Sequence, residues 1–177
     1  ACSGLALGSP KNEWLELARD DTTLRAGMEW LYELFEKAPE LGSLVDPRAG
    51  ARDMRQAEYA AVQPLLADAL KRESTEPEQM ERAVAPQGMA RAAELLSADY
   101  TLVITNVPYL GRGQQSNLLK DFADENFKDA KADLATIFFD RMLRWVGTSG
   151  TAAAVTPQHW LFLISYRKLR EKLLRSR

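Results

Sequence analysis

The spacing of hydrophobic and polar residues along the chain changes near residue 97. Before this point apolar side chains recur every three or four positions, which is typical of amphipathic helices packed on a core. The expected helices run from Asp21 or Thr22 to a stop at Pro39, over 54–71, from Pro77 onward, and over 89–96. No credible strand run precedes residue 97, so we interpret 1–96 as a helical insertion or spacer.

After this point, segments with strand-type and helix-type patterns alternate. The expected elements are a strand over 101–105, a helix over 133–146, a strand over 151–156 and a helix over 166–174. Strand, helix, strand and helix in this order predict a right-handed parallel crossover unit. The second part of the chain, 97–177, is therefore expected to be an α/β unit that contains only part of a sheet.

The first predicted strand leads directly into the sequence Asn-Val-Pro-Tyr at 106–109. Leu102, Val103 and Ile104 follow one another without a polar residue, which predicts a strand buried on both faces. Open α/β sheets bind ligands beyond the carboxyl ends of their strands. At that edge a planar base can stack on Tyr109 while its exocyclic amine donates to the Asn106 amide oxygen. The pattern therefore predicts a nucleobase site.

Composition favours a globular protein of one domain or a little more. The chain has 177 residues, of which 46% are hydrophobic and 27% charged, and no apolar run approaches the roughly 18 residues of a membrane span. We therefore expect a cytoplasmic location and no membrane partner. A single cysteine and a single histidine exclude an internal disulfide and argue against a zinc site.

Charge is distributed unevenly along the chain. Residues 1–100 carry a net charge of −7 and residues 101–177 carry +5, although the whole chain carries only −2. A polyanion is expected to meet the second part, because lysine and arginine supply most of the non-specific affinity for nucleic acids. A chance difference between the two halves is an equally open interpretation.

Residues 110–117, Leu-Gly-Arg-Gly-Gln-Gln-Ser-Asn, follow the predicted site. Two glycines around Arg112 predict a mobile polar loop without regular structure. The loop matches a phosphate-binding loop poorly, since no lysine and serine or threonine follow at the required spacing. We interpret it as a loop that closes over a ligand, with an inert surface loop as the alternative.

Four segments in this order resemble the amino-group DNA methyltransferases that use S-adenosylmethionine. Residues 106–109 resemble the Asn-Pro-Pro-Tyr motif of that family, with valine in place of the first proline, and 133–138 resemble its following helix. Residues 155–161 are similar to the next strand and its exit, and 166–171 to the helix beyond. The string at 105–115 resembles in particular the adenine-specific methyltransferases of bacteriophage-exclusion (BREX) defence systems and related restriction-type adenine methylases.

The resemblance covers about residues 95–177 and implies a fold and a reaction. The fold is the C-terminal part of a Rossmann-like methyltransferase sheet, preceded by a mostly helical insertion. The reaction is methyl transfer from S-adenosylmethionine to the N6 amine of an adenine flipped out of double-stranded DNA, in phage defence or restriction-modification. Other defence-system proteins are then possible partners.

The family motif implies a role for each residue of 106–109. The Asn106 amide oxygen and the Val107 carbonyl accept the two protons of the target amine, and Pro108 fixes the turn. Tyr109 stacks on the extruded base. The structural alternatives are a turn-forming asparagine at a strand end and a partly buried core ring.

Further residues have two interpretations each. Asp133 contacts the cofactor side of the pocket or caps its helix, and Phe138 borders the cofactor's adenine or packs in the core. Arg112, Gln114 and Lys120 are candidate DNA contacts, with a solvated surface as the alternative. His159 is not assigned to catalysis, because the sequence indicates neither a partner carboxylate nor a nucleophile for it.

The cofactor-binding half of the family pattern is not found in this sequence. In the family, a glycine-rich loop and an acidic strand end precede the motif at 106–109. We therefore expect a piece of a longer protein, inactive alone. The alternative is a non-catalytic module that binds a nucleobase or a protein at the same edge, and a nuclease elsewhere in the parent is a third possibility.

Overall fold

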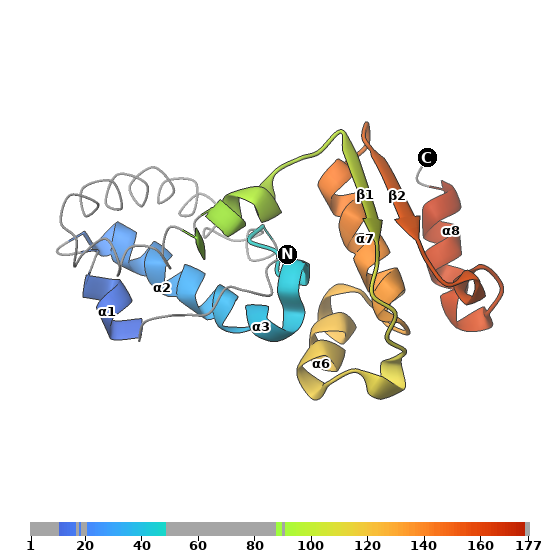
Figure 1. The fold of residues 1–177 in the computed structure, drawn as a ribbon, viewed down its shortest axis with the longest axis horizontal. Helices are drawn as coiled ribbons and strands as arrows, with labels where there is room; N and C mark the ends of the chain where they lie inside the picture. The colour runs from blue at the N-terminus through green and yellow to red at the C-terminus, as the bar shows by residue number, and fades with distance from the viewer. Residues whose placement is uncertain (1–10, 17, 19–20, 49–87, 90, 176–177) are drawn as a thin grey trace. The chain divides into compact units, whose positions relative to one another are not determined.

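The computed structural model describes residues 11–16, 18, 21–48, 88–89 and 91–175. It divides into two compact units, Ala1–Ala98 and Asp99–Arg177 (Figure 1). The helices expected over 54–71 and from Pro77 onward lie outside the described residues.

The described part of the first unit is helical. Its elements are α1 (Lys11–Glu16), α2 (Thr22–Glu36), α3 (Ala38–Leu41), a 3₁₀ turn (Gly42–Leu44) and the helical residues 88–89 and 91–97. The predicted start of α2 is confirmed, since the Asp21 carboxylate accepts hydrogen bonds from the backbone N–H groups of Thr23 and Leu24. Pro39 lies in the first turn of α3, where a proline costs no hydrogen bond.

The described residues of the second unit form two strands, three α-helices and three 3₁₀ turns. In chain order they are β1 (Leu102–Asn106), a 3₁₀ turn (Arg112–Gln114), α6 (Asn117–Asn126), α7 (Leu134–Val146), β2 (Thr151–Val155), two 3₁₀ turns (Gln158–Leu161 and Ile164–Tyr166) and α8 (Arg167–Arg175). Both strands and the helices α7 and α8 are confirmed. Helix α6, which Ser116 caps through the N–H of Leu119, was not predicted.

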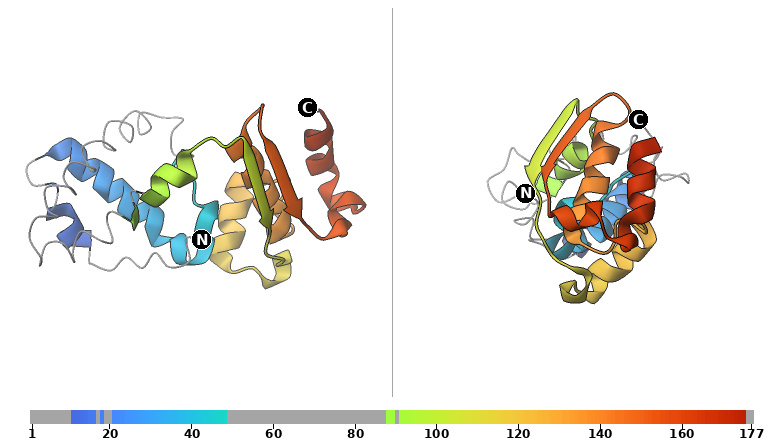
Figure 2. Two further views of the ribbon diagram at one scale, coloured as in Figure 1. Left: turned by 45° about the horizontal axis from the view of Figure 1, so that its top comes forward. Right: turned by 90° about the vertical axis from the view of Figure 1, so that its right-hand side faces the viewer.

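The two strands are parallel, as predicted, and form a two-stranded sheet, with α6 and α7 in the connection between them. Figures 1 and 2 show α7 running along one side of both strands. The side chains between this helix and the sheet form one cluster, made of Val103, Val107, Ala135, Phe138, Met142, Trp145, Ala152 and Ala154. The second unit is thus a mixed helix and strand structure, as expected of an α/β fragment.

The opposite face of the sheet is exposed, and the prediction that β1 is buried on both faces is wrong. Leu102 is 52% exposed, Ile104 70% and Val155 60%. Successive side chains of a strand point to opposite faces, so these residues face away from α7. Parallel sheets are ordinarily covered on both faces. The apolar run from Leu102 to Ile104 does not by itself tell whether other described residues cover this second face of the sheet.

The glycine-rich break between α7 and β2 is set by two glycines. Gly147 ends α7 with a φ of 58°, which glycine adopts without a steric penalty. A Cβ at Gly150 would lie 2.6 Å from the Tyr100 carbonyl oxygen and 2.7 Å from Val146. Only glycine therefore lets β2 begin this close to the start of β1.

Candidate functional site

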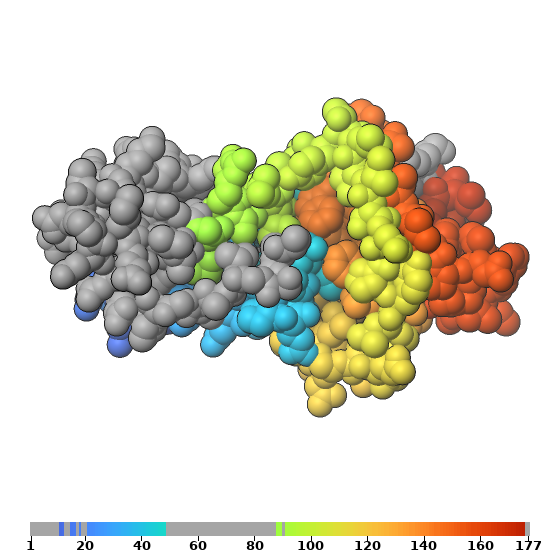
Figure 3. Space-filling model, in the orientation of Figure 1, coloured from blue at the N-terminus to red at the C-terminus, as the bar shows by residue number. Residues whose placement is uncertain are grey.

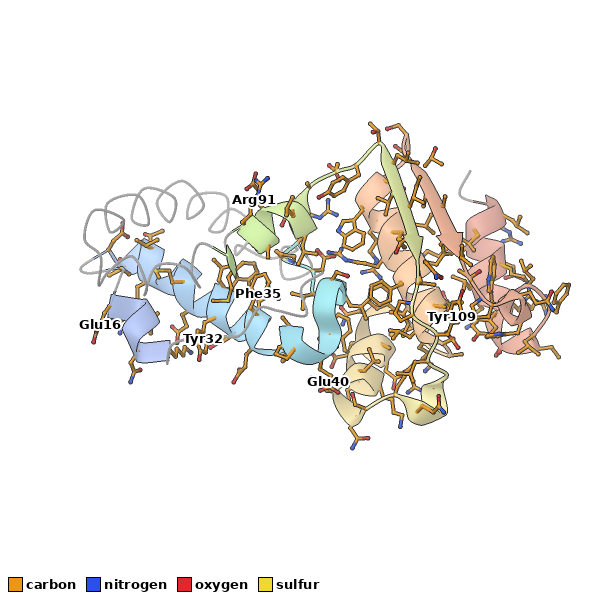
Figure 4. All side chains as sticks on the ribbon, viewed as in Figure 1. Glu16, Tyr32, Phe35, Glu40, Arg91 and Tyr109 are labelled. Atoms are coloured by element: carbon orange, nitrogen blue, oxygen red, sulfur yellow. The ribbon has the colours of Figure 1, made fainter. Side chains whose placement is uncertain are left out.

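The predicted site lies where both strands end. Asn106, the last residue of β1, is paired with Val155, the last residue of β2. The Tyr109 hydroxyl lies 3.2 Å from the Asn106 Oδ1 and 3.4 Å from the Val155 carbonyl oxygen. Figure 4 labels Tyr109 in the second unit. A phenol has one proton, so it donates to one of these two acceptors at a time. An amide oxygen and a backbone carbonyl from neighbouring strands therefore converge on one donor position.

Burial separates Val107 from the residues on either side of it. Val107 is 3% exposed and belongs to the cluster between the sheet and α7. Asn106 and Pro108 are exposed, and Tyr109 is 53% exposed. The buried Val107 side chain thus anchors this segment, while the Asn106 amide and the Tyr109 ring remain at the surface. The alternative that Tyr109 is a core ring does not fit this exposure.

The segment after Tyr109 is more regular than predicted. The N–H of Arg112 donates to the Ala132 carbonyl over 3.0 Å and the N–H of Leu134 donates to the Leu110 carbonyl over 2.9 Å, while Gly111 forms an antiparallel bridge with Asp133. Figure 3 shows the strip of surface, yellow-green to yellow, that β1 and this segment form. The prediction that this loop has no regular structure is wrong, because these backbone contacts bind it to residues 132–134, and its mobility stays a prediction.

The candidate DNA contacts in this segment have different surroundings. Arg112 forms an ion pair with Asp124 over 2.6 Å, and Lys131 reaches the same carboxylate over 2.8 Å. These two cations, Lys131 first, hold the pKa of Asp124 below its ordinary value. Gln114 is exposed, and Lys120 is half-buried on α6. The guanidinium of Arg112 is thus engaged within the unit, and the three DNA roles stay predictions.

On helix α8, as at Arg112, arginine side chains bind groups of their own unit. The Arg170 guanidinium donates to the backbone carbonyls of Trp160 and Leu163 over 2.7 and 2.8 Å. Arg167 pairs with Glu171 one turn further along the helix. Arg170 therefore orders the segment between β2 and α8.

The two candidate cofactor residues both make structural contacts. The Asp133 Oδ1 accepts from the N–H of Ala135 over 2.8 Å, so this carboxylate caps α7 and is buried. Phe138 packs against Val107 and Met142 in the cluster. The Asp133 carboxylate has further acceptor positions, and its second oxygen makes no hydrogen bond that the structure describes. These two residues do not amount to a cofactor site, and their role beside S-adenosylmethionine stays a prediction.

His159 has the carboxylate partner that the sequence did not indicate. It lies on the 3₁₀ turn after β2, with its Nε2 3.9 Å from the Asp133 Oδ2 and 3.3 Å from the Tyr166 hydroxyl. Tyr166 is 2% exposed, and burial, followed by the charge of Asp133, raises its pKa. A signal was present, because Asp133 precedes a helix and His159 follows a strand at the predicted ligand edge.

The comparisons with known proteins place this architecture in a family. The model of the Eco57I restriction-modification methylase family matches residues 16–177, and the chain belongs to that family. The resemblance inferred from residues 95–177 is thereby confirmed, and the match includes most of the first unit as well.

Two curated relatives are adenine-specific methyltransferases. BrxX of Escherichia coli O9:H4 (strain HS) is 32% identical over 143 residues, which are 80% of this chain and 11% of that protein. PglX of Lacticaseibacillus casei (strain Zhang) is 32% identical over 87 residues, which are 49% of this chain and 7% of that protein. The chain thus corresponds to a small part of each relative.

Two features are absent from the described residues. None of the helices in the described part is long and apolar enough to cross a membrane. Within the same residues no group of histidine, cysteine and carboxylate side chains is placed to hold a metal ion.

Proposed function

We propose that this chain carries the base-binding side of a methyl-transfer site that acts on the N6 amine of adenine in DNA. The observation that carries the proposal is the convergence of the Asn106 amide oxygen and the Val155 carbonyl on one donor position at the strand ends. Family membership and the adenine-specific relatives support the reaction class. The second unit is then the C-terminal part of a Rossmann-like sheet.

The exocyclic amine of adenine needs this kind of environment, because its lone pair is delocalised into the ring. Two acceptors that take its protons favour a pyramidal nitrogen and direct the lone pair toward an electrophile. The Asn106 oxygen is one acceptor, and the Val107 carbonyl, as in the family motif, or the Val155 carbonyl is the other. S-adenosylmethionine supplies an electrophilic methyl group when it is bound to the parent protein.

Tyr109 has to move when a base binds. Its hydroxyl lies within hydrogen-bonding distance of both acceptors, in the position that the amine would take. Rotation of the ring out of this position frees the Asn106 oxygen and presents the ring face for stacking. The exposure of Tyr109, 53%, leaves room for that rotation. The hydroxyl thus satisfies the Asn106 oxygen while no base is bound.

In duplex DNA the target base is stacked and paired, so the proposed site cannot reach it there. The N6 amine of adenine is engaged in a base pair inside a duplex, so the adenine has to be flipped out, at a cost of a few kcal/mol that stacking on Tyr109 offsets. The name of the matching family supports a role in restriction-modification, and the resemblance of residues 105–115 supports a role in phage defence, with further defence proteins as partners.

The test is methyl transfer from labelled S-adenosylmethionine to unmethylated DNA by the full-length protein. Asn106→Ala is expected to lower the rate by about 100- to 1000-fold, the effect of removing one well-placed polar group from an active site. Asn12→Ala, at an exposed asparagine of α1, is the matched control and is expected to leave the rate unchanged. Base binding without any transfer by the wild type would instead support a non-catalytic binding module.

A further inference from the structure

Three polar side chains outside the proposed base site meet beside the start of α7. They are the carboxylate of Asp133, the imidazole of His159 and the phenol of Tyr166. Asp133 and Tyr166 are buried, whereas 40% of the His159 side chain is exposed. The His159 and Tyr166 rings also contact each other, with centroids 5.7 Å apart. The methyl-transfer chemistry described above uses none of the three.

Their position connects the two segments that leave the strands. On one side, the segment after Tyr109 is bound to Asp133 through the bridge at Gly111 and the hydrogen bond from Leu134 to Leu110. On the other side, His159 follows Val155 by four residues, and the Val155 carbonyl lies 3.4 Å from the Tyr109 hydroxyl. The contact between Asp133 and His159 therefore closes a ring of contacts around the strand ends.

We propose that His159 is a positioning residue, which, together with Asp133 and Tyr166, holds the segment after β2 against the start of α7 and so maintains the spacing of Tyr109 and Val155. The proposal rests on the proposed function, because the spacing of these two residues matters for the binding of a base. His159 itself does not need to touch the base.

Asp133 and Tyr166 are the buried members of this group. The Asp133 Oδ1 accepts the hydrogen bond of the helix cap, and its Oδ2 faces the His159 Nε2 across 3.9 Å, which is longer than a hydrogen bond. The Tyr166 hydroxyl lies 3.3 Å from the same nitrogen and also interacts with the Thr136 side chain. Loss of the imidazole removes the contact between the segment after β2 and the Asp133 carboxylate, and one of the partners of the buried Tyr166 hydroxyl, so we expect this segment to shift.

The chain offers conservative variants and a matched control. Asp133→Asn keeps the helix cap, because asparagine caps as well as aspartate, and removes only the charge that faces His159. Asp21→Asn makes the same change at the cap of α2, where the carboxylate accepts from two backbone N–H groups. Tyr166→Phe removes the hydroxyl and retains the buried ring. None of these changes is expected to prevent folding.

The first measurement is steady-state kinetics of methyl transfer by the full-length protein. His159→Asn and Asp133→Asn are each expected to lower kcat about 10-fold with KM for DNA unchanged, and the double variant is expected to be no worse than either single one. Asp21→Asn is expected to match the wild type. Unchanged kcat in the single variants, or additive losses in the double variant, would overturn the proposal.

The second measurement does not depend on activity, so it separates a failure of this proposal from a failure of the proposed function. His159 is the single histidine of the 177 residues, so its imidazole signals in NMR spectra of this chain are unambiguous. Asp133→Asn and Tyr166→Phe are expected to shift these signals and the backbone amide signals of Tyr109 and Val155, whereas Asp21→Asn is not. A shift confined to His159 would show a local structural contact only and would contradict the positioning role.

Discussion

The two segments that leave the carboxyl ends of β1 and β2 are held in place by different kinds of contact. After β1, backbone hydrogen bonds of Leu110 and Arg112 and the buried side chain of Val107 bind the chain. After β2, side chains do so: Arg170 binds two carbonyls, and Trp160 donates to Thr156 over 2.9 Å. Substitutions should therefore affect the two segments differently, because the backbone hydrogen bonds of the first segment persist in a variant, whereas the side-chain contacts of the second segment can be removed.

The two strand ends also contribute different groups to the proposed site. The end of β1 and the segment after it contribute an exposed amide, at Asn106, and an exposed ring, at Tyr109. The end of β2 contributes the Val155 backbone carbonyl, and Arg170 orders the segment that follows. We expect substitutions in the first segment to affect base binding directly and substitutions in the second to affect it through position.

The largest effect is expected at the aromatic ring. Tyr109→Ala should weaken binding of a flipped base by about 1–3 kcal/mol, because the stacking surface is lost. Tyr109→Phe should bind as well as the wild type or better, because the ring remains and the hydroxyl no longer occupies the Asn106 oxygen. Titration of DNA that carries a fluorescent adenine analogue measures both. Equal losses in the two variants would show that the hydroxyl, and not the ring, holds the base.

Next in size is the difference between two valines at the strand ends. Val107→Ala is expected to lower the free energy of unfolding by about 2 kcal/mol, because a buried side chain loses two methyl groups and leaves a cavity. Val155→Ala, at a residue that is 60% exposed, should cost less than about 0.5 kcal/mol. Urea denaturation of both variants provides the comparison. Similar losses would contradict the assignment of Val107 as the anchor of the first segment.

Two arginines of α8 test the side-chain contacts after β2. Arg170→Met removes the charged donor of two backbone carbonyls and is expected to cost about 1–2 kcal/mol of unfolding free energy. Arg167→Met removes a surface ion pair and should cost less than about 0.5 kcal/mol. Urea midpoints measure this difference too, and a larger loss for Arg167→Met would refute the role given to Arg170.

The smallest effect is expected at Asp124, whose pKa Lys131 and Arg112 lower. A lowered pKa in the folded state stabilises the fold above the unfolded-state value of about 3.9, and this stability is lost as the pH falls through the folded-state pKa. The urea midpoint of Asp124→Asn should therefore lie slightly below that of the wild type at pH 7, and the gap should close in acid. A gap that is independent of pH would indicate a contribution other than charge.

Local chemistry explains which parts of this fold could be predicted. The cap at Asp21, the strand that ends at Asn106 and the break at Gly147 and Gly150 all depend on residues close together in sequence. Helix α6 also had readable signals, a Ser116 cap followed by apolar residues at helical spacing, and was overlooked.

Contacts between distant segments were not predictable in the same way. The exposure of Ile104 depends on what covers the sheet, and the ordering of the loop after Tyr109 depends on Ala132 and Leu134. The pairing of His159 with Asp133 requires the three-dimensional arrangement of a strand exit and a helix start. Of the proposed site, Asn106 and Tyr109 could be identified from the sequence, whereas the Val155 carbonyl emerged from the strand register.

The most direct test of the central claim is the identity of the methylated base. Unmethylated DNA is incubated with the full-length protein and S-adenosylmethionine, digested to nucleosides and analysed by mass spectrometry. The acceptor pair at Asn106 and the neighbouring carbonyl predicts methylation of an exocyclic amine, and the adenine-specific relatives lead us to expect N6-methyladenine, with only traces of it for Asn106→Ala. Methylation of the cytosine amine instead, or N6-methyladenine at the wild-type level with Asn106→Ala, would contradict the account.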